Sequence, residues 1–246
     1  VEFQLLITNN GNKDVINVIL SSEGTTTGWD VSFPQEAIPV YQSQTKSVLI
    51  TVKAPGDARA NEKLVISMIG VIQKSTQYRD IAPLTVIVNH VYDFDAVVLE
   101  KEGVSVDPGD TARFSIQISN LGNGEDLIKP SAYEILLDWN LTFYNQNGYK
   151  KYEVTLDYQD NIFLVAHLKV PENTREGDDY VVGVNLTGEG SSKLVYVRVK
   201  VNQTYDLRVR TETGESNMTS SIQPALGKTF VVKVSNMGNG WENVRM

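Results

Sequence analysis

One short passage occurs three times in this chain, each time at the end of a stretch in which apolar and polar residues alternate. The copies read ITNNGN at 7–12, ISNLGN at 118–123 and VSNMGN at 234–239. They lie 111 and 116 residues apart, which is the length of a whole domain and far longer than one unit of a solenoid. The sequence therefore predicts a tandem array of one kind of domain.

A second pair of matching segments locates the boundaries between the copies. VNQTYDL at 201–207 matches VNHVYDF at 88–94, and each segment leads from the last strand of one copy into the next copy. We therefore expect a truncated domain at 1–91, a complete domain at 92–204 and the start of a third domain at 205–246. These segments lack the Gly, Ser and Pro content of a loose tether, which predicts semi-rigid connections.

Each copy contains about seven short alternating stretches and no sustained helical period, which predicts an all-β fold of tandem immunoglobulin- or fibronectin-like β-sandwich domains. WNLTF at 139–143 repeats WDVSF at 29–33, and alternation places its aromatic residues on one face. The two tryptophans are candidate sugar platforms, but this alternation favours core packing. DPGD at 107–110 predicts a tight turn, with PALG at 224–227 in the same place of the third copy. The predicted core of the complete copy comprises Phe114, Ile116, Ile118, Trp139 and Phe143.

The order of these motifs resembles known module families. GWDVSF at 28–33 followed by VKAP at 52–55 is similar to the NEW3 family, and LRV at 207–209 followed by 230–238 resembles the CARDB family of adhesion-related modules. The NEW3 resemblance implies immunoglobulin-like modules that occur beside carbohydrate-binding domains and in archaeal surface proteins. Residues 60–62 depart from that family, which usually has a glycine there. Neither resemblance implies a catalytic residue.

Charge and composition restrict the partners. The chain has 22 basic and 30 acidic residues and a net charge of −8, which opposes binding to a nucleic-acid backbone. Cysteine is absent, so disulfides and thiolate metal sites are excluded. No run approaches the ~20 apolar residues that cross a membrane, so we expect membrane contact only through an anchor outside this segment. Both ends look cut from a longer polypeptide.

Few residues suggest chemistry. The two histidines, His90 and His167, occupy non-equivalent positions of the repeat, and no nucleophile elbow occurs. We therefore predict no catalytic, cofactor-binding or metal-ligating residue and no enzymatic activity. Calcium stays open as an alternative, because hard cations take several oxygen ligands and the boundary segments contain suitable side chains. The candidates at the first boundary are Asn89, Asp93 and Asp95; at the second they are Asn202 and Asp206, with Arg208 in place of the third acid.

Four Asn-x-Thr sequons are candidate glycosylation sites, provided that the protein is exported. Two are predicted on the polar sides of strands, one in a boundary segment and one in a loop. They are Asn140, Asn185, Asn202 and Asn217.

These observations favour an extracellular structural or adhesive array, part of an archaeal cell-surface or S-layer-like assembly. Its expected partners are neighbouring domains, copies of itself and possible glycans. One alternative is a carbohydrate-binding or spacer module of a secreted glycoside hydrolase. The first copy lacks an equivalent of 92–111, the segment that contains the first strand, and the simpler expectation is that this strand lies upstream in the same chain. The other alternative is a self-assembling filament subunit, in which a neighbouring subunit donates the strand.

Overall fold

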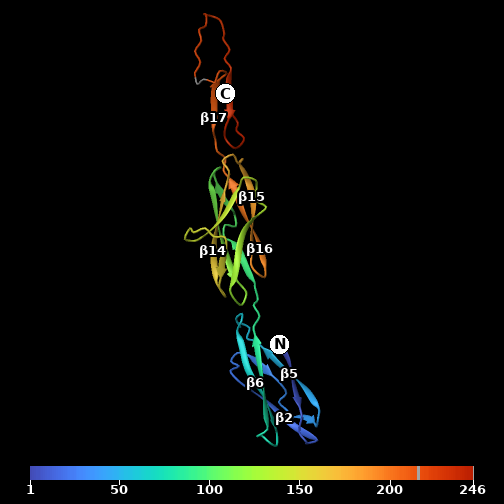
Figure 1. Ribbon diagram of the computed structural model, residues 1–246. Coiled ribbons are helices and arrows are strands. Elements are labelled where there is room, and N and C mark those ends of the chain that lie inside the picture. Colours follow the sequence, from blue (N-terminus) through green and yellow to red (C-terminus); the bar gives the residue numbers. More distant parts are fainter. Residues whose placement is uncertain (215–216, 246) are drawn as a thin grey trace. The chain divides into compact units, whose positions relative to one another are not determined.

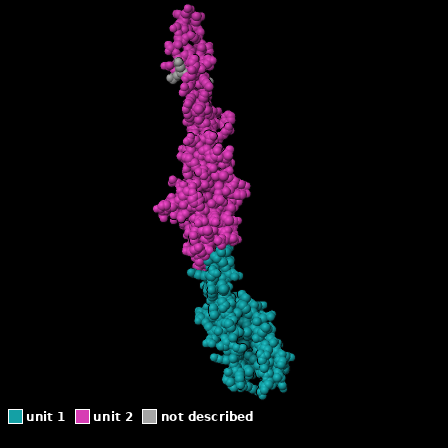
Figure 2. Space-filling view, in the orientation of Figure 1, with its two compact units in different colours: residues 1–92, 122–124 teal, residues 93–121, 125–246 magenta. Residues whose placement is uncertain are grey.

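The computed structural model describes residues 1–214 and 217–245, apart from the side chains of residues 178 and 179. The described elements are all β-strands, as predicted (Figure 1). They form two compact units, coloured teal and magenta in Figure 2. Unit 1 comprises residues 1–92 and 122–124, and unit 2 comprises residues 93–121 and 125–246. The predicted division into three domains stays a prediction.

Unit 1 is a sandwich of two antiparallel sheets. One has the order β1 (Glu2–Thr8), β5 (Thr45–Lys53), β3 (Asp30–Ser32). The other has the order β4 (Ile38–Tyr41), β2 (Val15–Glu23), β6 (Lys63–Ile72), β7 (Arg79–Ile87). Alternate residues of both sheets point inward, so that Ile50 of β5 and Ile66 of β6 are each 1% exposed. Trp29 is partly buried and packs against this core.

Unit 2 contains a second sandwich. One sheet has the order β12 (Asn140–Asn145), β14 (Asn161–Lys169), β10 (Thr111–Asn120), β8 (Phe94–Val98). The other has the order β13 (Val154–Leu156), β11 (Asp126–Tyr133), β15 (Gly177–Thr187), β16 (Ser192–Val201), β9 (Val104–Val106). The same unit also contains a two-stranded sheet of β17 (Leu207–Thr211) and β18 (Val232–Asn236).

The predicted core of the complete copy is confirmed. Phe114, Ile116 and Ile118 on β10 are fully buried, and Trp139 and Phe143 are 9% and 6% exposed. Burial of both aromatic side chains removes the surface that a sugar platform at Trp139 needs, so the structural interpretation of this tryptophan holds.

The predicted number of strands was too low for the complete copy, which contains nine strands, β8 to β16, within the described residues. The first predicted strand is divided at Gly103. β8 pairs with β10 in one sheet, whereas β9 runs parallel to β16 in the other. Gly103 has φ +86°, and a Cβ there would lie 2.8 Å from the carbonyl oxygen of Arg198. Glycine thus permits the chain to cross between the sheets.

The predicted turns are observed, with one shift. Asp110 N donates to Asp107 O at 3.1 Å, and Gly109 takes a positive φ, as the DPGD pattern requires. In the third copy the equivalent bond runs from Leu226 N to Gln223 O, and the positive φ falls on Ala225. This turn therefore begins one residue earlier than predicted.

Candidate functional site: the repeated asparagine turns

The first asparagine of each repeated turn stabilises the turn itself. Asn9 is buried, and its Nδ2 donates to the carbonyl oxygens of Lys13 and Val40 at 3.1 and 3.2 Å. Asn120 is also buried, and its Nδ2 donates to Leu156 O at 2.9 Å. Each of these side chains joins the turn to a neighbouring strand connection, as expected for a buried amide, which needs hydrogen-bond partners.

The second asparagine of the turn makes a different set of bonds. In unit 1, Asn123 Oδ1 accepts from Val91 N at 2.8 Å. Its Nδ2 donates to Asn89 O and Ala58 O at 3.0 and 3.3 Å. The backbone adds two bonds, from Ala60 N to Asn123 O and from Asn123 N to Val91 O. We call this set of bonds the asparagine clasp.

The clasp occurs again in unit 2, at the equivalent residues of the next repeat. Asn239 Oδ1 accepts from Thr204 N at 2.7 Å, and Nδ2 donates to Asn202 O and Thr174 O at 2.9 and 3.3 Å. Glu176 N donates to Asn239 O, and Asn239 N donates to Thr204 O. The amide side chain supplies the one acceptor and the two donor hydrogens that this geometry uses, whereas a hydroxyl has a single donor hydrogen.

The equivalent residue of the first turn, Asn12, makes no clasp. Its side chain is exposed, and within the described residues it has no hydrogen-bond partner. Asn12 is therefore an internal reference for the two clasped asparagines, because it occupies the same turn without the same contacts.

A glycine follows each clasped asparagine, for a steric reason. A Cβ at Gly124 would lie 2.8 Å from both Ala60 Cβ and His90 Nε2. A Cβ at Gly240 would lie 2.4 Å from Glu176 Cδ. The first turn, which has no clasp, has Lys13 at this position. The clasped turns thus share the pattern Asn-x-Gly-Asn-Gly. The glycine at its fifth position lies just after the six-residue passage that all three repeats share.

Both histidine rings pack against tyrosine rings. The His90 ring stacks on Tyr92, with ring centroids 3.7 Å apart, and lies against Gly124. The His167 ring packs against Tyr144 at 4.3 Å. Burial, and secondarily the charge of Arg113, lowers the pKa of His167.

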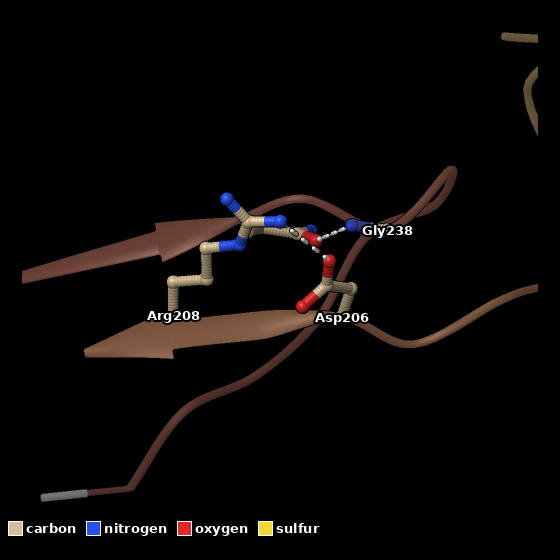
Figure 3. A network of polar contacts seen from close by, with 4 residues as sticks. Asp206, Arg208 and Gly238 are labelled. Atoms are coloured by element: carbon tan, nitrogen blue, oxygen red, sulfur yellow. Dashed lines mark hydrogen bonds and ion pairs between the residues drawn. The ribbon is translucent and has the colours of Figure 1, made fainter.

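The boundary residues that we considered for calcium have other partners in unit 2. The carboxylate of Asp206 forms an ion pair with Arg208 at 3.6 Å, close to the turn in which Gly238 N donates to Asn236 Oδ1 (Figure 3). The side chain of Asn202 donates to Asp107. Among the described residues, no group of three or more His, Asp or Glu side chains is placed to hold a metal ion. Calcium at the boundaries stays an open alternative to the prediction of no metal site.

The four sequons differ in accessibility, and we expect glycan occupancy to follow that difference. Asn140 and Asn217 are exposed. The Nδ2 atoms of Asn185 and Asn202 instead donate to Thr187 Oγ1 and Asp107 Oδ1, at 3.2 and 2.8 Å. Glycopeptide mass spectrometry of protein from its native host should find Asn140 or Asn217 occupied at least as fully as Asn202. Unmodified peptides at all four positions would contradict the prediction.

Comparisons with known proteins give no family. No family model matches the chain, and no curated protein matches it. Among solved structures, domains 4 and 5 of the S-layer protein SbsC align over 77% of this chain and 100% of theirs, at 14% identity and a TM-score of 0.30. BcpA, the major pilin subunit of Bacillus cereus, aligns over 97% and 85%, at 8% identity and a TM-score of 0.31.

A secreted serine protease, VesC from Vibrio cholerae, also aligns, over 79% of this chain and 46% of its own length, at 13% identity and a TM-score of 0.27. Scores of this size do not identify a relative, so the fold assignment above rests on the strand order and the cores. The resemblance to NEW3 and CARDB modules stays a prediction. No described helix is long and apolar enough to span a membrane.

Proposed function

We propose that this chain is a structural segment of an extracellular surface assembly, in which β-sandwich modules act as stiff spacers. The observation that carries the proposal is the asparagine clasp, which recurs with the same bonds at Asn123 and Asn239. In both cases the asparagine belongs to one repeat, and its bonding partners belong to the preceding repeat, partly to its last residues and partly to an earlier loop. A bond set repeated at each boundary supports a function in fixing how successive modules are connected.

The clasp is suited to stiffness because it uses backbone groups. The carbonyl of Asn89 and the N–H of Val91 lie within three residues of each other, in the segment that leads out of the first sandwich. The side chain of Asn123 therefore binds both an N–H group and a carbonyl group of this segment. Such restraint limits the swivelling of a short linker without requiring a large apolar interface.

Replacing the clasp asparagine tests this function. We expect Asn123→Ala to destabilise unit 1 by about 1–3 kcal/mol, because backbone groups lose their partners. We also expect the two units to tumble more independently, with shorter rotational correlation times in 15N relaxation. Asn239→Ala should lower the exchange protection of the Thr204 amide, which donates to Asn239 Oδ1.

Asn12→Ala is the matched control, since Asn12 is exposed and unclasped. Its effect on stability should be within about 0.5 kcal/mol. If Asn123→Ala leaves the relaxation of both units unchanged, the clasp does not set the stiffness of the connection and the proposed function loses its support.

One observation favours the alternative function, sugar binding. Trp241 is 94% exposed, whereas Trp139 is buried, so Trp241 is the tryptophan that offers a face to a sugar. Titration with soluble glycans, read from intrinsic tryptophan fluorescence and compared with Trp241→Ala, separates the two functions. A saturable change that the variant abolishes would favour a carbohydrate-binding module.

A further inference from the structure

Both clasp asparagines stand directly before a glycine, and this pair of residues is prone to spontaneous deamidation. The glycine nitrogen attacks the Cγ of the asparagine side chain, because no Cβ hinders closure of the ring. The bond from Cγ to Nδ2 then breaks, and Nδ2 leaves as ammonia with the proton of the glycine N–H. Water opens the resulting cyclic imide to aspartate or to isoaspartate, in which the main chain runs through the side-chain carbon.

The clasp cannot avoid this chemistry, because its geometry requires the glycine. A Cβ at Gly124 would lie 2.8 Å from Ala60 Cβ, and one at Gly240 would lie 2.4 Å from Glu176 Cδ. The unclasped turn has Lys13 at the same position. The residue that makes room for the clasp therefore also makes its asparagine reactive.

The hydrogen bonds of the clasp oppose the reaction while they last. Asn123 Oδ1 is bound to Val91 N at 2.8 Å, and Nδ2, the atom that has to leave, is bound to Asn89 O and Ala58 O at 3.0 and 3.3 Å. Ring closure turns the plane of the side-chain amide and makes Cγ tetrahedral, so it breaks these bonds. Deamidation thus proceeds from the opened clasp, and its rate follows the population of that local opening.

The product cannot close the clasp again. Aspartate is an acceptor only when ionised, so its oxygens would face the carbonyl oxygens of Asn89 and Ala58 without a hydrogen between them. Isoaspartate has in addition one more carbon in the main chain, which displaces the turn. A transient opening of the clasp is therefore made permanent by the loss of one ammonia molecule.

The chain contains its own references for this reaction. Two further asparagines, Asn10 and Asn147, also precede a glycine. Both are exposed, and within the described part of the chain their side-chain amides have no hydrogen-bond partner. They have the same reactive pair as Asn123 and Asn239 without the clasp.

We propose that Asn123 and Asn239 are deamidation sites that the clasp protects, and that their conversion permanently releases the boundary segments which the clasp restrains. This modification rests on the proposed function, because it is the way in which the stiffening contact is lost. Each boundary then has a covalent record of whether its clasp has opened.

The test follows all four Asn-Gly pairs in one molecule. The whole chain is incubated at mildly alkaline pH, and peptide mapping by mass spectrometry measures aspartate and isoaspartate at each position. In the folded chain we expect Asn123 and Asn239 to react at least about tenfold more slowly than Asn147. In denaturant all four rates should agree within about twofold, since local opening no longer limits them.

Two proline variants open one clasp each and leave both Asn-Gly pairs intact. Val91→Pro removes the N–H that donates to Asn123 Oδ1, and Thr204→Pro removes the one that donates to Asn239 Oδ1. Each variant should speed deamidation about tenfold at its own asparagine and leave the other clasp unchanged. Unchanged rates at Asn10 in unit 1 and Asn147 in unit 2 show that the sandwiches remain folded.

Asn123→Asp reproduces one product of the reaction. The Ala60 amide donates to Asn123 O in the clasp, so this variant should lose the exchange protection of that amide.

Three results overturn the proposal. The first is equal deamidation of Asn123, Asn239 and Asn147 in the folded chain, and the second is an unchanged rate at the targeted asparagine in both proline variants. The third is full protection of the Ala60 amide in Asn123→Asp, which would mean that the product keeps the clasp. Deamidation rates do not depend on how the two units tumble, so a failure here is distinguishable from a failure of the proposed function.

Discussion

Phe114→Ala is expected to destabilise the sandwich of unit 2 by ~3–5 kcal/mol, the cost of truncating a fully buried aromatic residue. Phe114 is 0% exposed on β10, the strand between β14 and β8. The ring belongs to the large buried cluster of this sandwich, and a packed core relaxes only partly into the space that a truncated side chain leaves. Chemical denaturation followed by the fluorescence of Trp139, which is buried in the same core, measures the loss.

Phe3 is the matched control, since it occupies the equivalent position on β1. It is only partly buried and packs at the margin of its core, so Phe3→Ala should cost about 1–2 kcal/mol. Because the two units can unfold separately, hydrogen exchange in β10 and β5 should be read as well as fluorescence. Equal losses for both variants would show that the second sandwich is no more tightly packed than the first.

Gly124→Lys is expected to remove the clasp of unit 1 and to cost about 3 kcal/mol, the upper end of the range for overpacking. The lysine copies the residue that the first turn has at the same position. Its Cβ would be placed 2.8 Å from Ala60 Cβ and His90 Nε2, so the turn has to move away from the residues it binds. Loss of exchange protection at the Val91 amide, with a lower unfolding midpoint of unit 1, checks the prediction.

Lys13→Ala controls for the change of side chain in an unclasped turn and should alter stability by less than about 0.5 kcal/mol. Gly124→Ala should be intermediate, because its methyl group meets Ala60 Cβ and His90 Nε2 at the same distance but adds no further side-chain atoms. A Gly124→Lys variant that keeps the protection of Val91 would show that the turn tolerates a side chain, and that the glycine is not required by the clasp.

The repeats made much of the fold predictable. Alternation in the segments that contain Phe114 and Trp139 indicated which side chains face the core, because a strand has a period of two. The turn at 107–110 was predictable because proline fixes φ at the second position of such a turn and glycine accepts a positive φ at the third. The strand count of the complete copy was not, since the crossing at Gly103 depends on how closely Arg198 approaches from another strand.

The site itself was only partly predictable. The repeated asparagine turn is the most prominent feature of the sequence, but the sequence does not show that its first and last asparagines make different hydrogen bonds. Their difference lies in partners distant in sequence: Asn9 bonds to Val40, 31 residues away, whereas Asn123 bonds to Ala58, 65 residues away. The sequence does distinguish the clasped turns, since Gly124 and Gly240 stand where the first turn has Lys13. The reason for these glycines becomes visible only in the structure, which shows the atoms that a Cβ would meet.

By itself the sequence determined the class of structure, the spacing of the repeats and the inward-facing residues, since these depend on local periodicity and on turn chemistry. Tertiary structure alone decided which repeated turns form clasps and which strand edges are covered. Both depend on contacts between segments far apart in the chain, and residues with the same local pattern, such as Ile7 and Ile118, acquire different surroundings. Ile118 on β10, between β14 and β8, is fully buried, whereas Ile7 on β1 is partly buried, because burial depends on which strands pack around a residue in the assembled sandwich.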